Sequence, residues 1–120
     1  MPDKPSPPLD DDALEAEMQA LSRAFVERLP GRITGIKDAA AAIDTAPDWP
    51  SASVALTELE RAAHAISGSS ALFGFPALAE AAATLEEACL AVIASEGPLS
   101  EIEARLQPLV NAVLLEAEKA

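Results

Sequence analysis

The only histidine of the chain, His64, has the spacing of a residue on the outer face of a helix. At about 100° per residue, Leu59, Ile66 and Phe73 fall on the opposite side of this helix. The imidazole is therefore predicted to face solvent, among small or polar neighbours. A neutral imidazole is a nucleophile toward an activated phosphoryl group, and the phosphoramidate that forms is labile enough to pass the group on. His64 is thus a candidate for phosphoryl transfer between proteins.

Gly68 follows His64 by one helical turn on the same face, where it removes a side chain beside the imidazole. A glycine inside a helix costs about 0.5–1 kcal/mol relative to alanine, so its presence requires a compensating reason. We interpret Gly68 as clearance for the phosphate-bearing loop of a docking partner. Ser69 and Ser70 are interpreted as helix residues that bond back to carbonyl groups or pack against a neighbouring helix.

The stretch from His64 onward resembles the motif of histidine-containing phosphotransfer (HPt) domains, roughly His-x-Leu-Lys-Gly-Ser-x-x-x-x-Gly before a leucine and a Leu-Glu pair. Residues 64–74 read His-Ala-Ile-Ser-Gly-Ser-Ser-Ala-Leu-Phe-Gly, and Leu78 and the pair Leu85 and Glu86 follow. The resemblance covers about residues 20–96, and its specific part is confined to residues 64–86.

The resemblance implies that His64 is the phosphoacceptor, that Gly68 gives clearance and that Gly74 ends the histidine helix. It implies a phosphoryl carrier of a two-component phosphorelay, with no ATP-dependent kinase activity of its own. The implied partners are response-regulator receiver domains, whose aspartates donate and accept the group, and a hybrid or sensor histidine kinase. No cofactor or metal site is expected in this chain, because no carboxylate cluster is predicted around His64, and Mg²⁺ is expected on the receiver.

One position departs from the family pattern, because Ser67 stands where the family usually has lysine. A hydroxyl can bond to a phosphoryl oxygen but brings no positive charge to stabilise it. Arg61, one turn before the histidine, either supplies that charge or forms a surface ion pair with Glu58. The predicted partner-docking residues around the site are Glu60, Ala71, Leu72 and Phe75.

Ser67 keeps a second interpretation open. In that alternative the chain is a degenerate HPt-like helical adaptor that binds receiver domains or kinases without carrying phosphate. A third class, the histidine-bearing domain of a two-component kinase, uses a different motif and needs an attached ATP-binding domain. No glycine-rich nucleotide motif occurs in these 120 residues, so phosphorylation from ATP alone is not expected.

The composition limits the classes of partner. A formal net charge of −12, with only eight Lys and Arg residues, argues against nucleic acid, which requires clustered basic side chains. The same charge would repel anionic lipid, and no apolar run approaches the roughly 20 residues of a membrane span. The first residues lack the apolar core of a secretory signal, so we expect a cytoplasmic protein. Cys89, the sole cysteine, is predicted to be a small buried hydrophobe.

An all-α fold is predicted, because alanine, leucine and glutamate dominate and tyrosine is absent. Residues 1–9 contain four prolines and predict a flexible tail, whereas residues 10–120 predict one domain. Apolar residues at spacings of three and four predict an antiparallel up-down four-helix bundle, which we expect to be a monomer. The glutamates fall mostly on outward arcs and are interpreted as solvated.

Prolines and glycines mark the predicted helix ends. Pro30 and Gly31 interrupt the first apolar pattern, which predicts either a kinked helix or two abutting helices, and so an additional N-terminal helical segment. A loop at residues 46–50 precedes the histidine helix, for which Ser51 or Ser53 is the predicted N-cap. Gly74 is predicted to end that helix, with Pro76 in the first turn of the next. The first apolar stripe, predicted to face the core, is Leu14, Met18, Leu21, Phe25 and Leu29.

Overall fold

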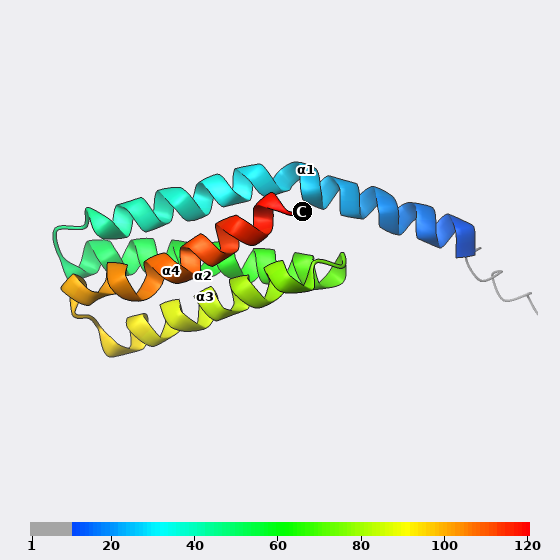
Figure 1. The fold of residues 1–120 in the computed structure, drawn as a ribbon. Helices are drawn as coiled ribbons and strands as arrows, with labels where there is room; N and C mark the ends of the chain where they lie inside the picture. Colours follow the sequence, from blue (N-terminus) through cyan, green and yellow to red (C-terminus); the bar gives the residue numbers. More distant parts are fainter. Residues whose placement is uncertain (1–10) are drawn as a thin grey trace, which may run out of the picture.

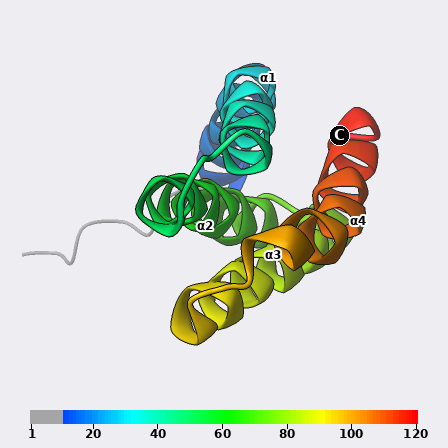
Figure 2. The same ribbon diagram turned by 90° about the vertical axis from the view of Figure 1, so that its left-hand side faces the viewer.

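The computed structural model describes residues 11–120, and the regular structure of this range is entirely helical. The helices are α1 (Asp11–Asp44), α2 (Trp49–Leu72), α3 (Pro76–Ser95) and α4 (Leu99–Glu118). Consecutive helices run in opposite directions, and α2 and α4 each pack against both α1 and α3 (Figure 1, Figure 2). The predicted all-α up-down four-helix bundle is confirmed. The Pro-rich tail predicted for residues 1–9 lies outside the described residues and stays a prediction.

The core receives large apolar side chains from all four helices. Burying one such side chain stabilises the fold by about 1.5–3 kcal/mol, so the core holds the helix axes and their rotations in place. Cys89 is fully buried, as predicted. The largest fully buried apolar side chains are Ile36, Leu56, Leu59, Ile66, Leu85 and Ile102.

Helix α1 continues without a break through Pro30, so the additional N-terminal helical segment predicted from the sequence is not a separate element. Proline removes only one backbone donor from a helix. Pro30 lies on the exposed side of α1, and the hydroxyl of Thr34 donates to its carbonyl oxygen over 3.1 Å. The helix changes direction about midway along its length instead of ending (Figure 1).

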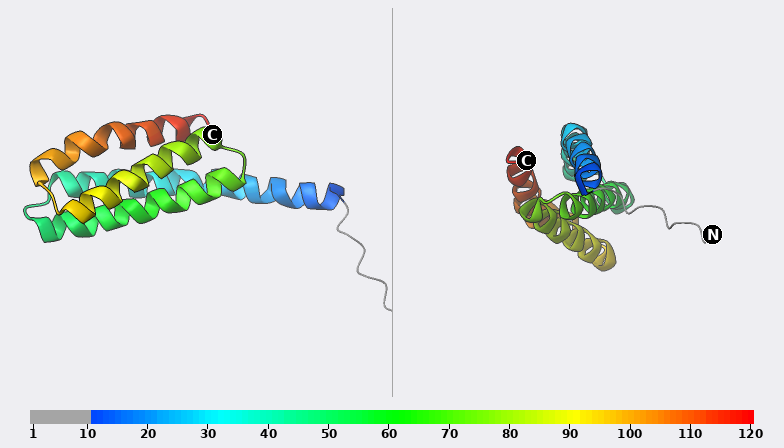
Figure 3. Two further views of the ribbon diagram at one scale, coloured as in Figure 1. Left: turned by 90° about the horizontal axis from the view of Figure 1, so that it is seen from below. Right: turned by 90° about the vertical axis from the view of Figure 1, so that its right-hand side faces the viewer.

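The first half of α1 extends past the ends of the other three helices (Figure 1, Figure 3). Leu14, Met18 and Leu21 are 45%, 37% and 47% exposed, so the prediction that they face the core is wrong. They share the face that buries Phe25, but the other three helices leave them largely uncovered, and only Met18 among them lines a hollow with Leu72 and Phe73 at the end of α2. Phe25 is the first buried residue of α1, with its ring centroid 5.7 Å from that of Phe73.

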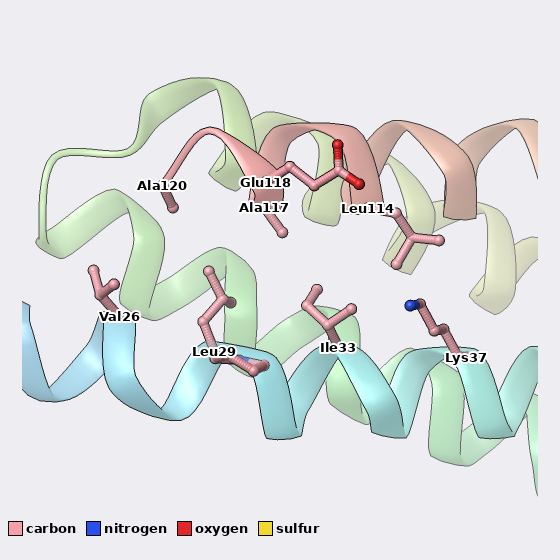
Figure 4. Close-up of a pocket in the computed structure, with 9 residues that line it drawn as sticks. Val26, Leu29, Ile33, Lys37, Leu114, Ala117, Glu118 and Ala120 are labelled. Carbon is pink, nitrogen blue, oxygen red and sulfur yellow. The ribbon is translucent and has the colours of Figure 1, made fainter.

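A groove of about 300 Å³ separates α1 from the C-terminal part of α4 (Figure 4). Its walls are mainly apolar and come from α1, α4 and the last residues of the chain. No described helix combines the length and apolar character that a bilayer span needs. The groove is lined by Val26, Leu29, Ile33 and Lys37 of α1 and by Leu114 and Ala117 of α4.

The ends of α2 fix the helix that carries His64. At its start the Asp48 carboxylate accepts the Ser51 N–H over 2.9 Å, so Asp48 is the N-cap, and the prediction of Ser51 or Ser53 is wrong. This hydrogen bond lowers the pKa of Asp48. At its other end Gly74 adopts a φ of +85°, and the Phe75 N–H donates to the Ser70 carbonyl over 2.9 Å. This left-handed C-terminal ending confirms the predicted role of Gly74.

Helix α3 begins at Pro76, as predicted, and the apolar residues that recur along it at spacings of three and four are all buried. In α4 two of the residues that the spacing predicts to face the core are not fully buried, because Leu99 is 38% exposed and Leu109 is half-buried. The predicted stripe is Leu99, Ile102, Leu106, Leu109 and Val113. Pro108 lies inside α4 without ending it. The buried stripe of α3 is Leu78, Ala82, Leu85, Cys89 and Val92, and that of α4 is Ile102, Leu106, Val110 and Val113.

Candidate functional site

His64 lies on the solvent side of α2, with 75% of its side chain exposed. On the opposite side of the same helix, Leu59 and Ile66 are fully buried, and so is the adjacent Ala63. Because these residues are anchored on both sides of His64 in the sequence, the backbone cannot rotate the imidazole inward without exposing them. The predicted outward orientation of His64 is confirmed.

The imidazole contacts a carboxylate from the neighbouring helix. His64 Nδ1 lies 2.5 Å from Oε2 of Glu86 on α3, and the Glu86 side chain is only 19% exposed. An ionised carboxylate only accepts hydrogen bonds, so Nδ1 must carry the hydrogen and donate it. In a neutral ring the other nitrogen, Nε2, then keeps its lone pair. The contact therefore selects the tautomer in which Nε2 has the free lone pair.

The surface beside the imidazole is low. A Cβ atom built on Gly68 would meet nothing within 4 Å, so this position opens onto free space. Ser67 is half-buried and Arg61 is exposed. Within residues 11–120, Arg61 forms no ion pair with Glu58, so the predicted surface pair is not found. A partner can therefore approach His64 over a strip of small side chains.

A family comparison agrees with this arrangement. The model of the family described as Hpt domain matches residues 20–118, which covers most of α1 and all of α2, α3 and α4. The chain belongs to the Hpt domain family. Neither the comparison with curated proteins nor that with solved structures gave a match.

Hpt domains act as phosphoryl carriers in phosphorelay signalling and are not autonomous kinases. They interact with receiver domains and histidine kinases, and they generally need no cofactor of their own. These properties agree with what the sequence motif implied for this chain.

The predicted docking residues of this Hpt domain differ in accessibility. Leu72 is 65% exposed and Ala71 is exposed, whereas Glu60 is half-buried. Phe75 was expected to be an exposed apolar residue, but it is half-buried and its ring centroid lies 5.6 Å from that of Phe25. Phe75 packs against Phe25 at the end of the bundle, where α1 extends past the other helices.

The sequence did not predict the carboxylates that surround His64 in this Hpt domain. Potential ligand atoms of Glu60, His64 and Glu86 all lie within 4.8 Å of one another. The expectation of no carboxylate cluster here is therefore wrong, as is the interpretation of Glu86 as a solvated residue. Leu85 points into the core, and Glu86 is the next residue of α3. The Glu86 side chain therefore lies at the edge of the interface between α2 and α3. That adjacency was the signal available in the sequence.

Cys89 lies in the wall beneath this Hpt site and is fully buried. Burial, followed by the negative charges of Glu60 and Glu86, raises the pKa of its thiol to about 12. The thiol is therefore protonated at neutral pH and is a poor nucleophile. The Cys89 side chain therefore has a packing role in the α2–α3 interface beneath the site.

Proposed function

We propose that this Hpt domain carries a phosphoryl group on Nε2 of His64, received from a receiver-domain aspartate and passed to another receiver. The observation that carries this proposal is the His64 to Glu86 contact, which occupies Nδ1 and leaves Nε2 as the nucleophile of an exposed ring. Membership of the Hpt domain family supports it, because its members transfer phosphoryl groups through histidine.

In the acceptor step the Nε2 lone pair attacks the phosphorus of the aspartyl phosphate. The bond from phosphorus to the aspartate oxygen breaks, and the aspartate leaves as a carboxylate. The ring keeps its proton on Nδ1 and becomes positively charged, and the nearby Glu86 carboxylate stabilises that charge. In the donor step a carboxylate oxygen of the next receiver's aspartate attacks the phosphorus and forms the new P–O bond, the N–P bond breaks, and the ring leaves in its neutral form. Mg²⁺ for both steps is expected on the receiver.

The proposed docking surface is the strip around His64. Gly68 gives the approaching phosphate loop space, and Ser67 offers a hydroxyl to a phosphoryl oxygen. Leu72 and Ala71 supply exposed apolar area toward the end of α2. Buried apolar contacts of this type give protein interfaces most of their affinity, whereas rim charges such as Arg61 act mainly on association rate.

The proposal is tested by incubating the chain with a ³²P-labelled receiver domain in Mg²⁺. We expect label on the wild-type chain that is lost in acid and stable in alkali, and none on His64→Ala. Glu86→Gln should still accept label, more slowly, because an amide can hold the ring but cannot offset its charge. Label that persists on His64→Ala, or that is stable in acid, would contradict the proposal.

The adaptor alternative is favoured by one observation. The proposed acceptor has a serine at the position where the family usually has lysine, and its nearest carboxylates, Glu60 and Glu86, would repel a phosphoryl group. His64→Gln separates the two functions, because glutamine keeps a polar side chain without a nucleophile. If His64→Gln still supports signalling in cells and binds receivers as the wild type does, the chain acts as an adaptor.

A further inference from the structure

Three potential metal ligands converge where α2 and α3 pack together. Glu60 and His64 are one turn apart on α2, Glu86 reaches them from α3, and their ligand atoms lie within 4.8 Å of one another. Two half-buried carboxylates and one exposed imidazole form this set. Zn²⁺ and related first-row ions bind imidazole nitrogen together with carboxylate oxygen, and three protein ligands plus water complete a tetrahedral site.

We propose that Glu60, His64 and Glu86 bind a divalent transition-metal ion, represented by Zn²⁺, through His64 Nδ1, and that the bound ion blocks phosphoryl acceptance. The first part stands on the cluster alone, and the second part rests on the proposed function.

The required movement is small. Zinc-to-ligand distances near 2.1 Å place tetrahedral ligands about 3.4 Å apart, so side-chain rotations at the surface bring the three groups to that spacing. Glu86 must move away from its 2.5 Å contact with His64 Nδ1, and the ion takes the place of the shared hydrogen. The helix backbones stay in place, because Ala63 and Leu85 beside the ligands are fully buried.

The charge of the site favours a cation. Glu60 and Glu86 both contribute, after burial, to raising the pKa of the thiol of Cys89, so their negative charges act on one small region. Within residues 11–120 no lysine or arginine forms an ion pair with Glu60 or Glu86, and the ion pair of Lys119 with Glu116 lies at the C-terminal end of α4. A divalent ion would neutralise both carboxylates at once.

Metal binding at Nδ1 changes the nucleophile. Without metal, the hydrogen of the neutral ring is on Nδ1 and the lone pair is on Nε2. The ion needs the Nδ1 lone pair, so the same single hydrogen moves to Nε2 and no proton is gained or lost by the neutral ring. Nε2 then has no lone pair with which to attack phosphorus. The ion therefore acts as a switch of tautomer at the acceptor.

The first test is calorimetric titration of the full chain with ZnCl₂ in a non-chelating buffer at neutral pH. We expect one saturable ion per chain, lost in His64→Ala and weakened about tenfold or more in Glu60→Gln and in Glu86→Gln. Glu58→Gln and Glu87→Gln are matched controls, because these exposed glutamates lie on the same helices outside the cluster, and they should bind as the wild type does. Fully buried Cys89 does not compete for the ion.

The second test is ¹⁵N NMR of the His64 ring, which should show hydrogen on Nδ1 without zinc and on Nε2 with zinc. Zinc should also suppress chemical labelling of the ring by phosphoramidate in wild type and in Glu58→Gln. Absence of saturable zinc binding, or binding that is unchanged in all three ligand variants, would overturn the proposal. Failure of phosphotransfer would leave the titration unchanged, and failure of zinc binding would leave receiver labelling unchanged, so the two proposals fail separately.

Discussion

The α2–α3 pair and the first half of α1 are both amphipathic helical surfaces, yet only the pair is covered. Leu59 and Leu85 are fully buried, whereas Leu14 and Leu21 on α1 are 45% and 47% exposed. The proposed acceptor, its tautomer-selecting carboxylate and its clearance glycine all lie on the covered pair. The chemistry is therefore placed where burial fixes helix rotation, and the Hpt match begins at residue 20, close to where α1 joins the bundle.

The largest expected effect separates these two regions by stability. Leu59→Ala should lower the free energy of unfolding by about 2–5 kcal/mol, because it removes a fully buried side chain and leaves a cavity. The same change at Leu14 should alter it by less than about 0.5 kcal/mol, because the side chain is already largely in water. Urea denaturation of both variants measures the difference. Equal losses would show that the first half of α1 is covered in solution.

The second prediction concerns the interior of the α2–α3 pair at alkaline pH. The folded thiol of Cys89 has its pKa raised from 9.0 to about 12, so the unfolded chain loses this proton at lower pH than the folded chain. Stability from this group is complete below pH 9.0 and is lost as pH rises toward 12, by at most about 1.4 kcal/mol per pH unit.

Denaturation at several pH values, with Cys89→Ala as the reference, measures that slope. The difference between the two chains removes the contribution of lysines and arginines that titrate in the same range. If the wild type and Cys89→Ala lost stability in parallel, the thiol would have to be in contact with water.

The third prediction separates stability from function at Gly68. Because a Cβ has free space there, Gly68→Ala should stabilise the chain by about 0.5–1 kcal/mol through its better helix propensity. Gly68→Gln should fold as well but slow transfer from a phosphorylated receiver, since its side chain occupies the approach to His64. Thermal unfolding and the receiver assay measure the two effects. Unchanged transfer in Gly68→Gln would remove the clearance role.

The smallest effect is expected from removing residues 1–20. The melting temperature should change by less than about 4 °C, the shift expected for a loss of about 1 kcal/mol, because the deleted part of α1 buries none of its described residues. Phosphoryl acceptance should persist at the wild-type rate. A large drop in either quantity would mean that the two regions depend on each other.

The sequence predicted the α2–α3 pair well, because local signals decide it. Gly74 and Pro76 mark the turn, and the spacing of Leu59 and Ile66 places His64 outside. It did not distinguish Asp48 from the two serines as N-cap, since three capping side chains lie within six residues. The backbone geometry decides which of the three residues is the N-cap, and the periodicity of the sequence does not specify that geometry.

Two other features depend on partners that are distant in the sequence. The pattern of Leu14, Met18 and Leu21 identifies an apolar face, but whether a helix covers it depends on where α2 and α4 end. The contact of Glu86 with His64 spans 22 positions and depends on the relative rotation of two helices. Motif spacing identified His64 as the proposed acceptor but gave no information on its hydrogen-bond partner.

The short connection between α2 and α3, with Gly74 at a φ of +85° and Pro76 directly after Phe75, makes the two helices one mechanical unit. Inserting one residue within α3, between Pro76 and Glu86, would turn the part of the helix that follows it by about 100° and shift it by about 1.5 Å if the helix stayed regular. Glu86 would swing away from the ring and Leu85 would leave the core. The number of residues between the Gly74 turn and Glu86 therefore sets the hydrogen-bond partner of an imidazole that lies ten residues before the turn.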